Sequence, residues 1–563
     1  MFKKSPKNCF KPVLHTSAPV GAAAIDDIHK SGNGPILSYF NHFLLPQVDL
    51  LRGTDGEYIP LEMAAVVVDS QDQDQDRDQD QDNDRDRVYV SSSIYSHLCD
   101  IKEQIEKYQT AWDNIKKFTN PYEYIHTNVA GNKTNISKLR PLSRSFYKMI
   151  EILKNNNILS QYSNTVVTRP DYKMGINTFH LAEGPGGFIE ALSYLRGSDY
   201  QRVAAAAAAV STGATACNTS GGGGGGGGGT PVQILKRNTE LHEEYMKELE
   251  HMKLTRRIFD GTGNGTGNGT GNGTGNDYPT YGNDRYYGMT LVNDDPICPG
   301  WKKTRAFLEN HPNVLIETGA DKTGNLISLD NFHHCATKYR NKMDIITADG
   351  GFDFSVDFNN QENMATQLIL CEVFYALAMQ KQGGSFILKI FDVFHKPTVD
   401  ILYLLCYYYN NVVIMKPHTS RIANSEKYVI CQGFKIADSG KIIEQFARLF
   451  SSLTNAITSI LPQEHDLYFL NKIEEMNAMV SFQQIENITS TLSIITNHRN
   501  TEKLEQYKKT NINKCIAWCE HYDIPYHVYH AANQSTNIFL HKSVSVSASV
   551  SASVSAPLSA SSS

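Results

Sequence analysis

The sequence predicts an α/β fold built on a mostly parallel sheet. Short apolar runs of strand length alternate with longer helical runs between residues 178 and 434. Ionisable side chains stand at or near the ends of several of these runs, and a Gly-rich turn links the first run to the helix after it. Strands that alternate with helices form parallel sheets covered on both faces. Because ligands bind at the edge where such strands end, we expect the functional site there.

Seven segments have the length and composition of strands. They lie at 178–183, 287–292, 313–317, 343–348, 385–391, 412–415 and 427–434. The short link between the last two predicts an antiparallel pair, so we expect a mixed sheet. Between these strands, the pattern predicts a long amphipathic helix at 363–382 and a buried helix at 398–409.

Composition separates folded parts from low-complexity tracts. We expect a variable N-terminal region at 1–90, a main domain at 91–436 with an insertion at about 197–285, a mainly helical accessory region at 437–540, and a Ser/Val/Ala tail at 541–563. The tail and the repetitive tracts inside the first two regions bury too little apolar surface to offset their ordering entropy. We therefore expect them to be disordered.

Charge and cysteine content narrow the class of protein. The tract from Asp69 to Arg87 holds nine Asp and three Arg, which accounts for the whole formal net charge of −6. The rest of the chain is balanced, so any nucleic-acid site must be a local patch. Ten cysteines without disulfide-like spacing indicate a reducing, intracellular compartment. No apolar run approaches the roughly 18 residues of a membrane span, so no membrane partner is expected.

The Gly-rich turn at 183–188, with the sequence EGPGGF, follows a predicted strand and opens a helix. Glycines permit a tight turn and let a ligand approach the backbone, while the helix N-terminus offers N–H groups to an anion. The turn does not fit G-x-G-x-x-G, so a dinucleotide is not predicted. Asp349 and Lys389 stand at two later strand ends, and Glu426 lies between two further strands.

Several segments, in order along the chain, resemble one known family. They are AEGPGGF, ADGGF, QENMATQLILCE, GGSFILKIFD and KPHTSRIANSEKYVICQGFK. Together they resemble the FtsJ/RrmJ family of S-adenosylmethionine-dependent RNA 2'-O-methyltransferases. They are most similar to its branch in eukaryotes and large DNA viruses, which methylates the first transcribed nucleotide of capped mRNA. The resemblance covers about 141–435 without the insertion and implies a Rossmann-like methyltransferase fold with a mixed seven-stranded sheet.

The resemblance implies a catalytic Lys-Asp-Lys-Glu tetrad. Its last three members fall on Asp349, Lys389 and Glu426. The first belongs on a helix before the Gly-rich turn, where SRSFYKMIEI supplies Lys148, with Lys154 as a weaker alternative. A ribose hydroxyl is a poor nucleophile, and Lys389 could remove its proton only if burial and nearby positive charges lowered the lysine pKa. Alternatively, Lys389 only orients the hydroxyl and water takes the proton.

The resemblance also implies a site for S-adenosylmethionine. The expected contacts are Glu183, Gly184, Pro185, Gly186, Gly187, Phe188, Asp294, Asn325 and Asp349. Asn325 stands where the family usually has Asp, so this position keeps an acceptor but loses its charge. We expect no metal. The spacing of Cys515 and Cys519, with histidines downstream, could bind zinc, but we expect a helix with two core cysteines instead.

The expected substrate is capped mRNA, with the capping or transcription machinery as further candidate partners and the nucleus or cytoplasm (or a virus factory) as the place of action. A ribosomal RNA 2'-O-methyltransferase and a catalytically silent RNA- or cap-binding subunit remain alternatives. Lys416, His418, Ser420 and Arg421 are either a phosphate-contacting patch or a solvated loop.

Overall fold

The computed structural model describes residues 41–50, 64–65, 88–162, 175–197, 284–292, 300–301, 303–351, 359–450, 457–497 and 501–527. The candidate cofactor contact Asp294 lies outside these residues. So do the tract at 69–87, the repetitive tracts of the insertion and the C-terminal tail.

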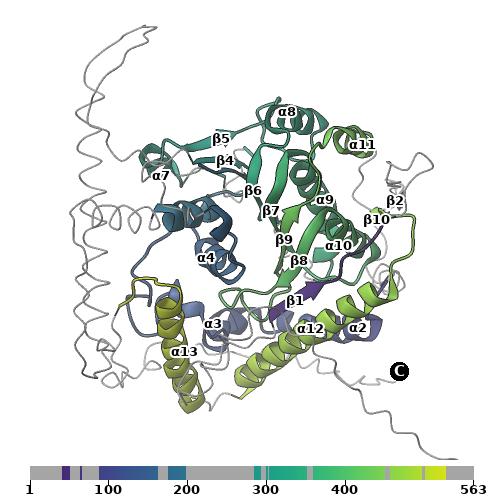
Figure 1. The fold of residues 1–563 in the computed structure, drawn as a ribbon. Coiled ribbons are helices and arrows are strands. Elements are labelled where there is room, and N and C mark those ends of the chain that lie inside the picture. The colour runs from purple at the N-terminus through teal and green to yellow at the C-terminus, as the bar shows by residue number, and fades with distance from the viewer. Residues whose placement is uncertain are drawn as a thin grey trace, which may run out of the picture. The chain divides into compact units, whose positions relative to one another are not determined.

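A mixed sheet organises the described residues (Figure 1). In spatial order its strands are β1 (His42–Leu45), β8 (Tyr409–Met415), β9 (Lys427–Phe434), β7 (Gln380–Ile390), β6 (Met343–Ala348), β3 (Asn177–Leu181), β4 (Arg285–Met289) and β5 (Val314–Glu317). Neighbours from β7 through β5 are parallel, whereas β9 runs antiparallel to both β7 and β8. The predicted mixed α/β sheet and its antiparallel pair are confirmed.

The described sheet has eight strands, one more than predicted. The additional strand is β1, which pairs antiparallel with β8 at one edge of the sheet. It lies inside the stretch at 1–90 where we predicted no strand. Its sequence, HFLL, is too short to show the alternation that marks a strand. Pairing with β8 therefore decides its conformation.

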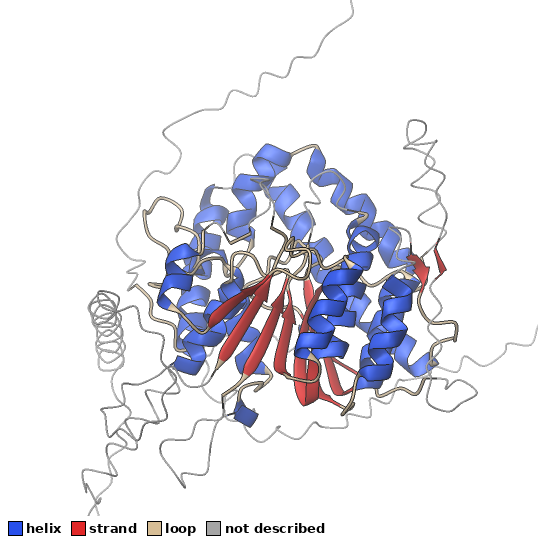
Figure 2. Cartoon of the chain, turned by 90° about the horizontal axis from the view of Figure 1, so that it is seen from above, coloured by secondary structure: helices blue, strands red, loops and turns tan. Residues whose placement is uncertain are grey.

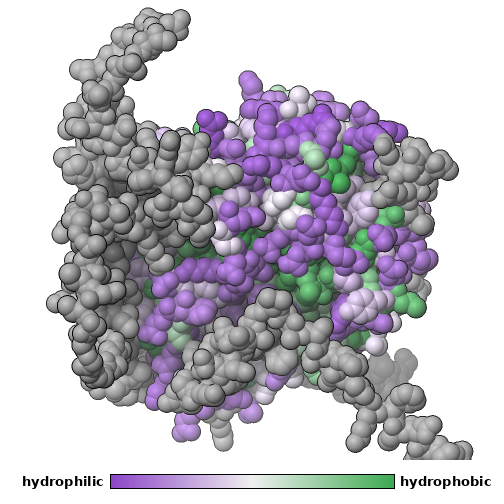
Figure 3. All heavy atoms as spheres, viewed as in Figure 1, coloured by the Kyte–Doolittle hydropathy of each residue, from purple (hydrophilic) through white to green (hydrophobic). Residues whose placement is uncertain are grey.

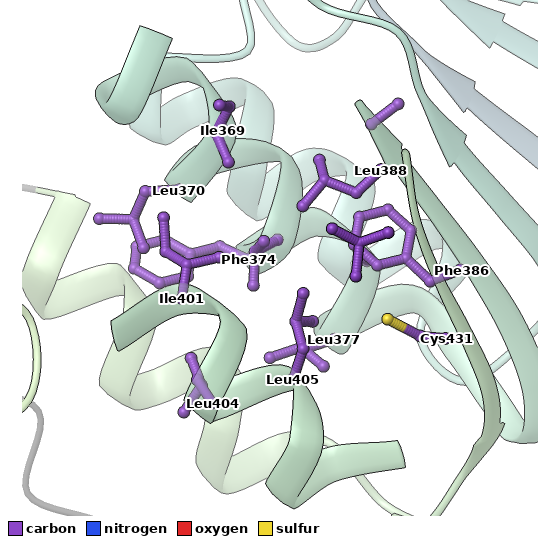
Figure 4. Packing of buried hydrophobic residues seen from close by; sticks show 14 of the residues in the cluster. Ile369, Leu370, Phe374, Leu377, Phe386, Leu388, Ile401, Leu404, Leu405 and Cys431 are labelled. Atoms are coloured by element: carbon purple, nitrogen blue, oxygen red, sulfur yellow. The ribbon is translucent and has the colours of Figure 1, made fainter. Parts of the chain in front are cut away.

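Helices cover both faces of the sheet (Figures 1 and 2). One face carries α8 (Leu329–Tyr339), α9 (Gln361–Met379), α10 (Lys396–Tyr408) and α11 (Gly440–Phe450). Figure 4 shows apolar side chains of α9 and α10 packed against β7 and Cys431 of β9. The opposite face carries α4 (Ser145–Asn155) and a helix at 187–197, and α13 (Thr501–His521) contributes side chains to the same core.

Alternation along each strand distributes side chains between these two layers. In β7, Phe386 and Leu388 join the core with α9, whereas Ile387 joins the core with α4. Because successive strand residues point to opposite faces, Lys389 belongs to the α4 side. In the same way, Tyr428 of β9 lies in the core with α4.

The helix α9 differs from its predicted amphipathic character. Every residue from Ile369 to Met379 is buried. The helix lies between β7 and the flanking helices α8, α10 and α11, so it has no solvent-facing stripe after its first turns. Helix α10 is buried as predicted.

The C-terminal helices pack against N-terminal ones. Helix α12 (Leu467–Thr496) lies along α2 (Ser92–Glu106) and α3 (Gln109–Thr119), and α13 packs on α3 and on the short helix η4 (Glu123–Ile125). Cys515 and Cys519 of α13 are both buried in the core that contains α4. A mainly helical C-terminal region is thus confirmed. The remaining elements are η5 (Ser160–Tyr162), α7 (Arg305–Asn310) and the paired strands β2 (Ala64–Ala65) and β10 (Ile457–Ser459).

No helix within the described ranges is long and apolar enough to cross a membrane. The described surface on the face shown in Figure 3 is mostly hydrophilic, with smaller apolar areas between the polar ones.

Candidate active site

Ionisable side chains gather at one edge of the sheet. Asp349 follows β6 directly, and Lys389 is the penultimate residue of the parallel strand β7. Since β9 runs antiparallel to β7, its first residues adjoin the end of β7, which brings Glu426 to the same edge. Asp349, Lys389 and Glu426 also share the parity that points to the α4 side of the sheet.

Helix α4 contributes the fourth member of this group. The Nζ atom of Lys148 lies 2.6 Å from Oε1 of Glu426, and both side chains are largely buried. Lys154, the alternative first member, instead donates to the carbonyl of Tyr522 and pairs with Asp523. The structure therefore brings Lys148, and not Lys154, together with the other three. We call Lys148, Asp349, Lys389 and Glu426 the tetrad.

The second half of the tetrad is the pair formed by Lys389 and Asp349. Nζ of Lys389 lies 3.3 Å from Oδ1 of Asp349 and donates to the backbone carbonyl of the same residue at 2.8 Å. The hydroxyl of Tyr428 donates to Asp349 Oδ1 at 2.9 Å and accepts from Lys148 Nζ at 3.4 Å. One tyrosine thus contacts a member of each ion pair.

The two lysines differ in their electrostatic balance. Burial lowers the pKa of Lys148, and attraction by Glu426 does not restore it to its ordinary value. Burial also lowers the pKa of Lys389, but the charges of Asp349, Glu426 and Glu372 outweigh it and leave that pKa raised. The sequence left open whether the pKa of Lys389 falls far enough for this residue to act as a base, and in the protein alone that pKa is raised. Of these two lysines, Lys148 is the one with the lowered pKa.

Glu372 is a third carboxyl beside Lys389. It lies on α9, is fully buried and accepts from the backbone N–H of Gly350 at 3.1 Å through Oε1. Burial raises the pKa of Glu372 to about 8, opposed by Lys389 and reinforced by Asp349. A Cβ atom at Gly350 would collide with this carboxyl, so the residue after Asp349 must be glycine for Glu372 to hold the turn.

The loop that precedes Glu426 is held from inside the protein. Glu151 of α4 accepts from His418, at 2.6 Å from the backbone and 2.7 Å from the ring, and Glu123 accepts two hydrogen bonds from Arg421. Ser420 donates to Glu426 Oε1 at 2.8 Å. These contacts fix the position of the Glu426 carboxylate.

The sequence left two alternatives for this loop, a phosphate-contacting patch or a solvated segment, and the same contacts test the second. Lys416 is buried and donates to the carbonyls of Asn424 and Glu426. With His418, Ser420 and Arg421 also bonded to protein acceptors, the loop is not a solvated segment, whereas its contact with phosphate stays a prediction. The reason is that α4 and η4 supply acceptors from a distant part of the sequence.

The Gly-rich turn lies beside the tetrad. A side chain at Gly187 would collide with the hydroxyls of Ser143 and Ser145, which lie five and three residues before Lys148 in the chain. Glu183 accepts from the backbone N–H of Phe188 at 2.5 Å, so its own carboxylate meets one of the helix N–H groups that we expected to face a ligand. The other oxygen, Oε2, is buried and has no hydrogen-bond partner among the described residues. The Phe188 ring is fully buried against Tyr428.

Asn325 lies in the loop after β5, which approaches the end of β4 through a hydrogen bond from Val292 to the Thr323 carbonyl. Its side-chain oxygen accepts from the backbone of Ile327 at 3.0 Å and so closes a local turn. That oxygen is the acceptor the sequence predicts for the cofactor. It is already engaged within the loop.

Sequence reasoning did not select Tyr428, Glu372 or Glu151, and it considered Ser420 only as a possible phosphate contact. Tyr428 had a usable signal, because it stands two residues after Glu426 and so shares its face of β9. Glu372 is an acid within an apolar helical run, LILCEVFYALA, which indicates a buried carboxyl. Glu151 gave no such signal.

Comparison with protein families supplies a match at this site. Residues 280–434 match the model of the family described as FtsJ-like methyltransferase. The match contains Asp349, Lys389 and Glu426. Lys148 and the Gly-rich turn precede it, and β3 joins that part of the chain to it by pairing with both β4 and β6.

Curated relatives share the same region. A cap-specific mRNA (nucleoside-2'-O-)-methyltransferase 1 of Dictyostelium discoideum is 34% identical over 31% of this chain and 24% of its own length. The cap-specific mRNA (nucleoside-2'-O-)-methyltransferase of Autographa californica nuclear polyhedrosis virus is 29% identical over 35% of this chain and 69% of its own. A Caenorhabditis briggsae relative, named an inactive cap-specific mRNA (nucleoside-2'-O-)-methyltransferase 1B, is 26% identical over 39% of this chain. This chain spans about a quarter of the length of the first and 28% of that of the third.

Proposed function

We propose that this chain, whose residues 280–434 form an FtsJ-like methyltransferase domain, is an S-adenosylmethionine-dependent RNA 2'-O-methyltransferase acting on the first transcribed nucleotide of capped mRNA. The observation that carries the proposal is the paired arrangement of the tetrad. Two lysine–carboxylate pairs at 2.6 and 3.3 Å stand at the strand edge beside a Gly-rich turn. Such an edge is where open α/β sheets bind ligands.

The residues of the turn suit the methyl donor. When bound, S-adenosylmethionine supplies an electrophilic methyl group on a positively charged sulfur. Glu183 offers a buried oxygen that lacks a hydrogen-bond partner among the described residues, which is what an ammonium group requires. Burial and the nearby Asp349 raise the pKa of Glu183 well above its ordinary value, so a cation placed there would favour its ionised form.

We propose that Lys389 orients the ribose hydroxyl and that the other tetrad residues hold Lys389. With its raised pKa, Lys389 is an ammonium at neutral pH in the free protein and can donate a hydrogen bond to the hydroxyl oxygen. A second positive charge nearby lowers the pKa of an amine, so Lys389 becomes a better base only in the loaded site. Positioning and proton removal are the two tasks that this reaction sets.

The names of the relatives support a capped substrate, and two alternatives remain open. A ribosomal RNA 2'-O-methyltransferase would use the same tetrad on uncapped RNA. A silent binding subunit has a precedent in the relative named as inactive. Against the silent reading, all four tetrad side chains are present here and form both ion pairs.

The test is transfer of labelled methyl from S-adenosylmethionine to short RNAs, capped or uncapped, with or without a 2'-O-methyl group on the first nucleotide. Transfer only to capped RNA with a free first hydroxyl is the expected result. Capped RNA that stays a substrate after this hydroxyl is blocked would place the reaction on the second nucleotide. Equal transfer to uncapped RNA would favour a structural-RNA enzyme, and donor binding without transfer would favour the silent subunit.

A further inference from the structure

Tyr428 is a fully buried residue whose hydroxyl has no role in the proposed reaction so far. It lies on β9 directly opposite Lys389 of β7 and Met415 of β8. Residues opposite each other in an antiparallel pair lie on the same face. Tyr428 therefore projects toward α4 beside Lys389, between the two ion pairs of the tetrad.

The ring of Tyr428 cannot move freely. Strands β7 and β8 flank it on both sides, and the Phe188 ring packs against it at 5.9 Å between centroids. Nζ of Lys148 lies 5.8 Å from its ring centre. A side chain confined in this way places its hydroxyl at one point, at little further cost in entropy.

The hydroxyl uses both of its hydrogen-bonding capacities on the tetrad. A phenol has one proton to donate and lone pairs to accept with. Here it donates to Asp349 Oδ1 at 2.9 Å and accepts from Lys148 Nζ at 3.4 Å. Burial, with Asp349 and Glu426 nearby, raises the pKa of Tyr428 well above its ordinary value, so the hydroxyl keeps its proton.

We propose that Tyr428 is a positioning residue that joins the Lys148–Glu426 and Lys389–Asp349 pairs into one rigid unit. The inference rests on the proposed function, since the unit matters for reaction geometry. Without the hydroxyl, Asp349 loses the donor that fixes its carboxylate, and Lys148 loses one acceptor. Each pair could then turn independently, and a small misplacement of Lys389 costs rate far more than it costs binding.

The test compares Tyr428→Phe with Tyr409→Phe in the full chain. Tyr409 is a matched control because it is also fully buried, and its hydroxyl contacts Gln380 at 3.3 Å, outside the tetrad. For Tyr428→Phe we expect kcat for capped RNA to fall about tenfold, with KM and the Kd for S-adenosylmethionine within about twofold. For Tyr409→Phe all three should stay within about twofold. Unchanged kcat in Tyr428→Phe, or equal losses in both variants, would overturn the proposal.

A second measurement does not depend on activity. Lys148→Met and Asp349→Asn are made singly and together, in the wild-type chain and in the Tyr428→Phe background, and unfolding is followed in urea. Lys148 and Asp349 also attract each other directly, so some coupling remains in both backgrounds. We expect the non-additivity in the unfolding constant to be about fivefold larger with tyrosine present than without its hydroxyl. Equal non-additivity in both backgrounds would contradict the inference. If the wild type methylates no RNA, the proposed function fails and this cycle alone decides the role of Tyr428.

Discussion

Two buried charge clusters lie at the end of β7, on opposite faces of the same strands. The tetrad faces α4. The second cluster consists of Lys102, Asp392 and Lys427, and we call it the reverse-face cluster. Asp392 follows Lys389 by three residues, and Lys427 follows Glu426 by one, so alternation sends neighbouring charges to opposite sides.

The clusters use similar ion pairs but differ in what surrounds them. In the reverse-face cluster, Lys102 of α2 reaches Asp392 at 2.9 Å, with side-chain exposures of 8% and 7%. Lys427 donates to the carbonyl of Ser425 and lies 3.8 Å from Asp392. In the tetrad, Lys389 and Asp349 keep exposures of 12% and 16%.

Because both clusters contain buried ion pairs, such a pair does not by itself indicate catalysis. The reverse-face cluster ties α2 to the sheet through Lys102, whereas Lys389 and Asp349 of the tetrad keep a somewhat larger part of their side chains exposed to solvent. Buried pairs contribute little net stability, but removing one partner leaves an uncompensated charge. Substitutions in the two clusters should therefore fail in different ways.

The largest expected effect follows from Lys389→Ala. Methyl transfer should fall by at least about 100-fold, because the hydroxyl loses its orienting group, while donor affinity stays nearly unchanged. Removing Lys389 leaves Asp349 without its counter-charge, but Asp349 keeps its bond to Tyr428 and Glu426 keeps Lys148. The loss in free energy of unfolding should therefore stay below the roughly 3–5 kcal/mol that an uncompensated buried charge costs. Turnover rates, calorimetric donor binding and urea unfolding measure these quantities. Substantial residual turnover would remove Lys389 from the mechanism.

Asp392→Asn should show the opposite pattern. Burial raises the pKa of Asp392 and the two lysines bring it below its ordinary value, so the carboxylate is charged. Its removal leaves Lys102 and Lys427 buried without that counter-charge and should lower the free energy of unfolding by about 3–5 kcal/mol. Urea unfolding measures this loss, with donor affinity measured at low temperature as the control. A loss below about 1 kcal/mol would mean that the reverse-face cluster is not a structural tie.

Glu372→Gln should change how the free energy of unfolding depends on pH. The folded-state pKa of Glu372 is raised to about 8, so its neutral form stabilises the fold at low pH, and this contribution is lost as pH rises through about 8. Between pH 6 and pH 9 the wild type should lose about 2–3 kcal/mol more than the variant, whose amide cannot ionise but still accepts from Gly350. Parallel stability curves in urea at the two pH values would contradict the raised pKa.

Lys154→Ala gives the smallest expected effect and serves as the control for Lys148→Ala. Both lysines lie on α4, but the pair of Lys154 with Asp523 is partly exposed, at 31% and 68%, whereas Lys148 is 5% exposed. Exposed pairs contribute about 0–1 kcal/mol, so stability and methyl transfer should change little. If Lys154→Ala reduced kcat as strongly as Lys148→Ala, the choice of Lys148 as the first tetrad member would be wrong.

The fold class and the positions of three charges follow from the amino-acid sequence alone. Strand-length apolar runs that alternate with helices predict the parallel sheet, and Asp349 and Lys389 at strand ends reach one edge because parallel strands end together. Alternation with a period of two puts them on one face. These inferences need only local patterns, which is why they could be made from residues alone. Lys148 came from the resemblance to a family motif.

Which charged side chains meet, and whether burial or nearby charges dominate their pKa, depends on how the helices and strands pack. Pairing with β8 made β1 a strand, Glu151 and Glu123 turned the loop before Glu426 inward, and Tyr428 linked the two ion pairs. The raised pKa of Lys389 reversed the expectation from burial, because three carboxyls from separate elements surround it. Such balances depend on distances between residues far apart in sequence, and these distances exist only once the helices and strands have packed.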